Sequence, residues 1–99
     1  MATVQLTNQG WAGWSSQGEL RIFASYHWLD ETGRIVEFDG ERTPLPGVIA
    51  AGTTREVGLN IVAPAAPGRY RLAIDLVQEG LTWFSQAGWP CLDIPFDVR

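Results

Sequence analysis

Apolar and polar residues alternate along most of the chain, and the three- and four-residue spacing of an amphipathic helix is not sustained in it. The clearest alternation lies in 69–78, where one face carries Tyr70, Leu72, Ile74 and Leu76. A two-residue period is typical of a strand with one buried face. With Gly and Pro as strand ends, strands are expected over 3–8, 19–30, 34–39, 53–63, 69–78, 81–84 and 92–99. The pattern predicts an all-β fold.

Two aromatic residues on these segments are expected to be structural. Trp28 shares one face of 19–30 with Tyr26 and other apolar residues. This is the position of the buried Trp on a central strand of a two-sheet domain. Tyr70 follows Pro, Gly and Arg at the start of its strand. That is the position of a tyrosine corner, whose hydroxyl bonds back to the backbone of the preceding loop. We therefore assign both side chains to the framework.

The number and spacing of the strands predict the architecture. Clusters of Gly, Pro and Asp separate about seven strands, which favours a two-sheet antiparallel sandwich resembling the immunoglobulin or fibronectin type III fold. A chain of 99 residues forms one domain, 1–99, because separate cores appear only in much longer chains. The stretch 39–47, rich in Pro and Gly, is expected to connect the two sheets. Pro95 marks the last strand as an edge strand or a bulge.

Composition narrows the possible partners. Hydrophobic residues make up 45% of the chain and charged residues 18%, a balance that is typical of a folded domain. A net charge of -4 argues against nucleic acid and anionic membranes, which attract clustered Lys and Arg. No apolar run approaches the roughly 18 residues of a membrane span. The single Cys91 excludes an internal disulfide and a Cys-based zinc site. Strands run to both termini, so we expect a module from a longer protein.

Catalytic chemistry has few candidate residues, so we expect no enzyme and no cofactor. His27 is the only His, and it lies within a strand rather than beside a nucleophile motif. It is expected to bond a neighbour through one ring nitrogen, and Cys91 is expected to be a small buried side chain. The turns with Asp30-Glu31 and Asp39-Gly40-Glu41 could supply oxygen ligands for Ca²⁺, but carboxylates bonded to their own turns explain them equally well.

Five Trp residues are a heavy load for a domain of this size. Trp11 and Trp14 lie in a loop of small and polar residues, and Trp89 lies in a second loop beside Gly88, so these rings have few covering neighbours in sequence. Exposed indole rings stack on the apolar faces of sugars. The candidate ligand-binding residues are therefore Trp11, Trp14, Trp89, Trp83 and Gln86. The alternative is that the loop Trp side chains fold over the ends of the sheets as plugs.

The conformation of Val48 and Ile49 decides whether the two Trp loops meet. If these residues form a true strand, the first loop and the loop 85–90 lie at opposite ends of the domain. If they form a mere connection, the two loops lie together. We expect the short strand, and hence two separate loops. Trp83 and Phe84 would then form a separate group with Arg42 and Thr43.

Several runs together resemble one protein family. They are Tyr-His-Trp-Leu-Asp at 26–30, Gly33, Asp39-Gly40, Arg-Thr-Pro-Leu-Pro at 42–46, Pro-Gly-Arg-Tyr at 67–70, Asp-Leu-Val-Gln-Glu-Gly at 75–80 and Trp-Phe-Ser at 83–85. This pattern, which covers nearly the whole chain, is similar to bacterial Ig-like modules of the cell-adhesion-related (CARDB-like) kind. The resemblance implies a non-catalytic module that is appended to surface or polysaccharide-processing enzymes, in an extracellular or cell-envelope setting.

Two functions follow from these expectations. The first is an accessory module that binds polysaccharide through its loop Trp residues. The second is a structural or protein–protein interaction module, which packs against a neighbouring catalytic domain through a sheet face or an open edge strand. The exposure of the Trp side chains discriminates between them: two or more exposed, coplanar rings favour sugar binding, and buried rings favour the second function.

Overall fold

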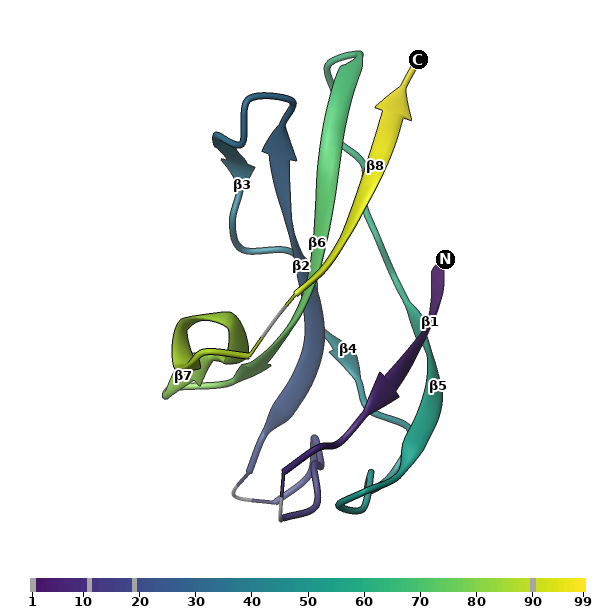
Figure 1. Cartoon of the computed structure of the whole chain (residues 1–99), viewed down its shortest axis with the longest axis vertical. Coiled ribbons are helices and arrows are strands. Elements are labelled where there is room, and N and C mark those ends of the chain that lie inside the picture. Colours follow the sequence, from purple (N-terminus) through teal and green to yellow (C-terminus); the bar gives the residue numbers. More distant parts are fainter. Residues whose placement is uncertain (1, 11, 19, 90) are drawn as a thin grey trace.

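The structure, a computed structural model, describes residues 2–10, 12–18, 20–89 and 91–99, and there it consists of strands and one short 3-10 helix (Figure 1). The elements are β1 (Ala2–Thr7), β2 (Ile22–Asp30), β3 (Ile35–Glu37), β4 (Thr43–Pro44), β5 (Thr54–Leu59), β6 (Gly68–Gln78), β7 (Thr82–Trp83), η1 (Phe84–Ala87) and β8 (Leu92–Val98). All strand pairs are antiparallel. The predicted all-β class is confirmed. Within the described residues, no helix is long and apolar enough to cross a membrane.

The strands form two sheets of unequal size. β2 and β6 are the centre of the larger sheet and pair from Ile22 opposite Gln78 to Asp30 opposite Tyr70. The outer edge of β2 pairs with β3 and β4, and the outer edge of β6 pairs with β8 and β7. In the described part of the chain, the smaller sheet contains only β1 and β5 (Figure 1). The larger sheet therefore has inner surface that two strands cannot fully cover.

The two sheets share one core. It contains side chains of both sheets and of the connecting loops: Val4, Trp14, Ile22, Ala24, Tyr26, Trp28, Leu45, Ile49, Val57, Leu59, Leu72, Ile74 and Leu76. Trp28 is 1% exposed, so its predicted core position is confirmed. Its indole N–H donates to the Val62 carbonyl at 2.8 Å, and the Tyr26 hydroxyl accepts the Val62 N–H at 2.9 Å. These bonds fasten the segment after β5 to the larger sheet, an arrangement compatible with a β-sandwich.

Tyr70 forms the bond that defines a tyrosine corner. Its hydroxyl donates to the backbone carbonyl of Ala66 at 2.7 Å, which ties the start of β6 to the loop before it. The predicted structural role of Tyr70 is confirmed. The motif could be recognised because donor and acceptor are only four residues apart.

The stretch 39–47 differs from the prediction of a simple connection between the sheets. Thr43 and Pro44 form β4 on the edge of β2, so the chain stays with the larger sheet before it crosses over. Pro44 is tolerated there because β4 is an edge strand. Gly40 begins this return by donating its N–H to the Tyr26 carbonyl, and an added Cβ would lie only 2.5 Å from that oxygen. The close approach of the two backbones therefore requires glycine.

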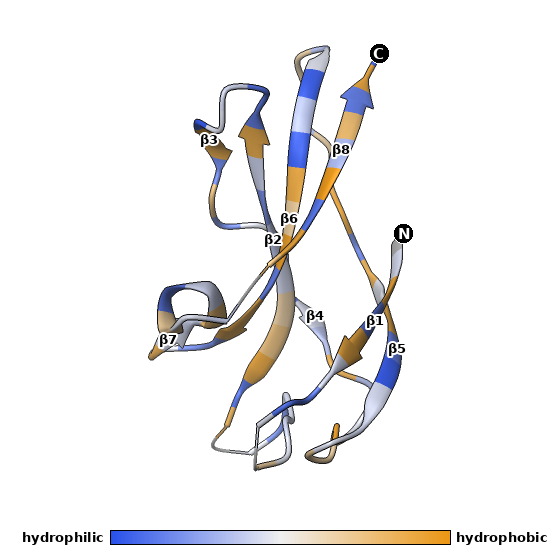
Figure 2. Ribbon diagram, viewed as in Figure 1, coloured by the Kyte–Doolittle hydropathy of each residue, from blue (hydrophilic) through white to orange (hydrophobic). Residues whose placement is uncertain are grey.

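β8 lies at an edge of the larger sheet, as Pro95 predicts, and in the described residues it pairs only with β6. Apolar and polar residues alternate along it (Figure 2). Phe96 points toward the core, since its ring centroid lies 5.4 Å from that of Trp28. Leu92 and Phe96 are nevertheless 51% and 43% exposed. The inner side of β8 is therefore only partly covered in the described residues.

Candidate functional site

Three aromatic rings from distant parts of the chain meet between the sheets. The ring centroid of Trp14 lies 5.4 Å from that of Phe84 and 6.0 Å from that of Trp89. Val48 and Ile49 form no strand, and Ile49 instead makes a single two-way backbone bridge with Trp14. The expectation that the two Trp loops lie at opposite ends is therefore wrong. The connection of 48–49 is irregular, and this brings the loops together.

The 3-10 helix places Trp89 in this cluster. Gly88 ends η1 in the left-handed region at φ 95°, which reverses the chain so that the Trp89 N–H donates to the Phe84 carbonyl at 3.0 Å. Phe84 and Trp89 then lie beside each other, with centroids 5.9 Å apart. Phe84 was not among the predicted site residues, because a Phe that follows a Trp in a presumed strand carries no separate signal.

The predicted sugar-binding residues fall into different environments. Trp14 is 8% exposed, so the expectation that it has few covering neighbours is wrong. Trp89 is half-buried and meets Trp14 edge to face at 79°, so the two rings form no flat platform. Gln86 is exposed on η1. Trp11 lies outside the described residues. The role of these side chains in binding a ligand stays a prediction.

A groove runs from the aromatic cluster along β1. Its cavity volume is about 230 Å³, and β1 forms one wall of it with Val4, Gln5, Leu6 and Thr7. The rest of the lining comes from the larger sheet, the aromatic cluster and the loop after β1: Gln9, Trp14, Ile74, Asp75, Leu76, Phe84, Trp89 and Leu92. The groove is therefore mainly apolar, with a strand backbone along one side.

The backbone of β1 offers hydrogen bonds at this groove. The Asn8 N–H donates to the Thr53 carbonyl beside β5. Because backbone groups alternate sides along a strand, the even-numbered residues of β1 face β5. Thr3, Gln5 and Thr7 therefore direct their N–H and C=O groups away from β5, where the described residues supply no strand. This free edge is ready to pair with an added strand.

The free edge of β1 lacks the usual protection against pairing. Edge strands are commonly blocked by charged side chains, Pro or bulges. β8 carries Asp93, Pro95 and Asp97, and β5 carries Arg55 and Glu56. Residues 2–18 include no charged residue, which makes β1 different from both. That run of neutral residues was the sequence signal for this site, and the strand pattern alone did not single it out.

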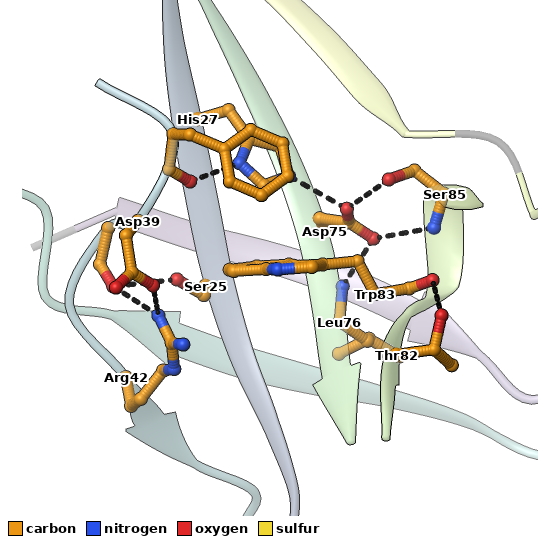
Figure 3. A network of polar contacts seen from close by, with 11 residues as sticks. Ser25, His27, Asp39, Arg42, Asp75, Leu76, Thr82, Trp83 and Ser85 are labelled. Atoms are coloured by element: carbon orange, nitrogen blue, oxygen red, sulfur yellow. Dashed lines mark hydrogen bonds and ion pairs between the residues drawn. The ribbon is translucent and has the colours of Figure 1, made fainter. Parts of the chain in front are cut away.

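The outer face of the larger sheet carries a polar cluster around the buried carboxylate of Asp75 (Figure 3). Its Oδ2 accepts hydrogen bonds from His27 Nε2 at 2.8 Å and Ser85 Oγ at 2.5 Å. Its Oδ1 accepts the backbone N–H groups of Leu76 at 2.8 Å and Ser85 at 3.1 Å. Burial by itself raises the pKa of Asp75, but the hydrogen bonds from His27, Ser85 and Leu76 outweigh it and lower that pKa below its ordinary value.

Ser, His and Asp occur together in this cluster, but their connections differ from those of a nucleophilic triad. The carboxylate of Asp75 lies in the middle, and the hydroxyl of Ser85 bonds to it rather than to His27. The second ring nitrogen of His27, Nδ1, faces the Phe38 carbonyl, so both ring nitrogens have partners. Sequence reasoning expected one such bond. With both nitrogens engaged, the geometry fits a structural ion pair.

Trp83 covers this cluster from outside. Its ring centroid lies 4.5 Å from that of His27 and 5.2 Å from that of Phe38, while the guanidinium of Arg42 lies 4.8 Å from the ring centroid. Arg42 also bonds Glu79 at 2.5 Å. The predicted grouping of Trp83 with Arg42 is confirmed, but Phe84, expected in the same group, lies with Trp14 and Trp89 instead. Thr43 instead accepts the backbone N–H of Asn60 through its hydroxyl oxygen.

The remaining candidate groups have local partners. Burial first, and then the negative charge of Asp75, raise the pKa of the Cys91 thiol, so the thiol stays protonated near neutral pH. The Asp30 carboxylate accepts bonds from the Thr32 hydroxyl, the Thr32 N–H and the Arg34 N–H, which makes it part of its own turn. Across the described residues, no group of three or more His, Cys, Asp or Glu side chains is placed to hold a metal ion.

Comparisons with known proteins return no match: no family model, no curated protein and no solved structure is significantly similar to this chain. The resemblance to CARDB-like modules therefore stays a prediction that rests on the motifs alone. The function has to be argued from the groove, the free edge of β1 and the polar cluster.

Proposed function

We propose that this domain is a non-catalytic interaction module that binds an extended polypeptide strand along the free edge of β1. The observation that carries the proposal is the combination of an unpaired, uncharged strand edge with an apolar groove beside it. In strand addition, backbone hydrogen bonds supply affinity, and pockets for alternate side chains supply specificity. β1 offers the first, and the groove between Leu6 and Leu92 offers the second.

The fold type is part of the same proposal. Two facing antiparallel sheets with a tyrosine corner support an Ig- or fibronectin-like sandwich of the CARDB-like kind. In this interpretation the smaller sheet is one strand short at β1. An added strand would cover Leu92, which lines the groove beside β1 and is exposed. The open side of the core thus supports a role in binding polypeptide.

The direct test uses a neutral probe peptide, acetyl-Thr-Val-Thr-Val-Thr-Val-amide, and amide hydrogen exchange read by NMR. Strand addition slows exchange at Thr3, Gln5 and Thr7, whose N–H groups face the free edge. The amide of Leu6 faces β5 and serves as the internal control, so its exchange stays unchanged. A peptide with Pro in place of its central Thr, whose N–H would face β1, should give no protection. The proposal fails if the probe protects none of the three outward amides.

Polysaccharide binding is a second proposal, which Trp89 supports because its half-buried ring lines the end of the same groove. Sugar rings would stack on Trp89, with polar side chains such as Gln86 beside it and with Trp11 and Trp83 as the further predicted residues. Affinity electrophoresis in polysaccharide gels tests this proposal. Binding that Trp89→Ala abolishes and Gln86→Ala weakens would support it, whereas equal mobility in all gels would contradict it.

A further inference from the structure

We propose that the strand added to β1 is β1 of a second copy of this chain, paired antiparallel about a two-fold axis at Gln5. This inference rests on the proposed strand-binding function and names its partner. A two-fold interface brings the same surface of both subunits together, so the edge has to be complementary to itself. The free strand edges of the molecule can be compared by that criterion.

Self-pairing at β1 satisfies the backbone. With Gln5 opposite Gln5 of the second copy, Thr3 lies opposite Thr7 of that copy, and Thr7 lies opposite its Thr3. All three residues direct their N–H and C=O groups to the free edge, so each opposed pair exchanges two hydrogen bonds. A shift of the register by two residues in either direction leaves one of the three without its partner. The axis at Gln5 is therefore the register that uses the whole edge.

The side chains of β1 also suit a copy of themselves. Thr3, Gln5 and Thr7 are exposed and uncharged, so the outer face would hold Thr–Thr and Gln–Gln pairs, which are compatible across strands. On the inner face, Val4 would lie opposite Leu6 of the second copy. These side chains point to the same side as the groove and the exposed Leu92. The paired strand thus adds apolar surface where the larger sheet is open.

The other two long free edges, those of β8 and β5, are unsuited to pairing with a second copy of themselves. About a two-fold axis at Pro95, β8 would place Asp93 opposite Asp97 of the second copy, with two Pro residues unable to donate. About an axis at Glu56, β5 would place two carboxylates opposite each other, and like charges across strands are destabilising. Only β1, of these three edges, is both uncharged and free of Pro. This difference selects the self-pairing edge.

Sedimentation velocity over a range of concentrations, from micromolar to millimolar, tests the inference. The wild-type chain is expected to form a reversible dimer. Gln5→Pro removes the two central hydrogen bonds but keeps the monomer, because its N–H faces solvent there. We expect the dimer dissociation constant to rise by about 10- to 100-fold. Glu56→Pro, directly across from Gln5 on the opposite free edge, is the matched control and should leave the dimer intact.

A second measurement locates the interface. Spin labels on Gln5→Cys, in a Cys91→Ser background, lie beside the proposed axis and should report a short distance between copies. Labels on Gln86→Cys should report a longer distance, because Gln86 does not line the groove beside β1. A dimer that persists in Gln5→Pro, or a long distance at Gln5→Cys, would overturn self-pairing. Circular dichroism melting checks that each variant is folded.

The outcomes separate this inference from the function on which it rests. A monomeric wild-type chain whose Gln5 amide is still protected by the probe peptide would overturn self-pairing and leave strand binding intact. A monomeric chain without protection would overturn both. A dimer that Gln5→Pro breaks and Glu56→Pro keeps, with probe protection in the monomer, would support both.

Discussion

The two faces of the larger sheet differ in whether the polar groups beside them have hydrogen-bond partners. On the outer face, the carboxylate of Asp75 accepts bonds from the side chains of His27 and Ser85 and from two backbone N–H groups. Across the inner face, the backbone of Gln5 points to a groove where no described strand meets it. The side chains that could do chemistry thus lie where their hydrogen bonds already have partners. The backbone groups without a described partner belong to β1, a strand with no charged residue.

This comparison indicates that the reactive side chains and the unpaired backbone groups lie in different parts of the domain. Ser, His and Asp form the cluster that a search for catalytic residues would select, yet their bonds point to one another. Thr3, Gln5 and Thr7 have no reactive group, but their backbone groups are available to a partner. Substitutions can test this difference: those in the Asp75 cluster should reduce stability, and those at the edge of β1 should reduce binding.

The largest effect on folding is expected for Asp75→Ala. Removing the carboxylate leaves His27 and Ser85 without their acceptor in a buried site, and losing one partner of a buried ion pair typically costs about 3–5 kcal/mol. Urea denaturation measures the change. Asp93→Asn is the control, because the exposed pair of Asp93 with Arg71 contributes only about 0.5 kcal/mol. Equal losses in the two variants would contradict the structural role of the cluster.

Trp89→Ala should have the next largest effect. Truncating a fully buried Trp costs about 3–5 kcal/mol, and this ring is half-buried, so we expect about 2 kcal/mol. The loss reflects its contacts with Trp14 and Phe84. Gln86→Ala, on the same turn but exposed, should change the free energy of unfolding by less than about 0.5 kcal/mol. If Trp89→Ala were equally silent, the ring would be a surface group available to sugars.

The sequence predicted those parts of the fold that depend on neighbours along the chain. The strand β6, the turn at Asp30 and the bond of Tyr70 to Ala66 involve residues within a few positions, and all three were found, although β6 is buried on both faces from Leu72 to Val77. The clusters were not predictable in this way. Trp14 meets Trp89, and His27 meets Asp75, although both pairs are far apart in the sequence, so their positions depend on strand pairing that a period does not encode.

Acid should reduce the contribution of the Asp75 cluster to the free energy of unfolding. Because hydrogen bonds lower the pKa of Asp75 in the folded chain below its ordinary value of 3.8, ionised Asp75 stabilises the fold above that pH. The stabilisation is lost as pH falls from about 3.8 through the lower folded pKa. His27 and Cys91 are the titratable groups beside it. Urea titrations over this range should show wild type losing its advantage over Asp75→Asn, and a constant advantage would contradict the assignment.

The smallest effect on folding, and a large one on association, is expected for Gln5→Lys. The side chain is exposed and lies opposite Glu56 in the β1–β5 pair, so the free energy of unfolding should change by less than about 0.5 kcal/mol. In a self-paired dimer, however, the two ammonium groups would lie opposite each other at the axis, where like charges repel. Sedimentation velocity should show a weaker dimer for Gln5→Lys and an unchanged one for the neutral Gln5→Asn. If the charge left the dimer as strong as in wild type, the partner would lie elsewhere. The apolar groove beside β1 would then be free to bind polysaccharide through Trp89, as the second proposal states.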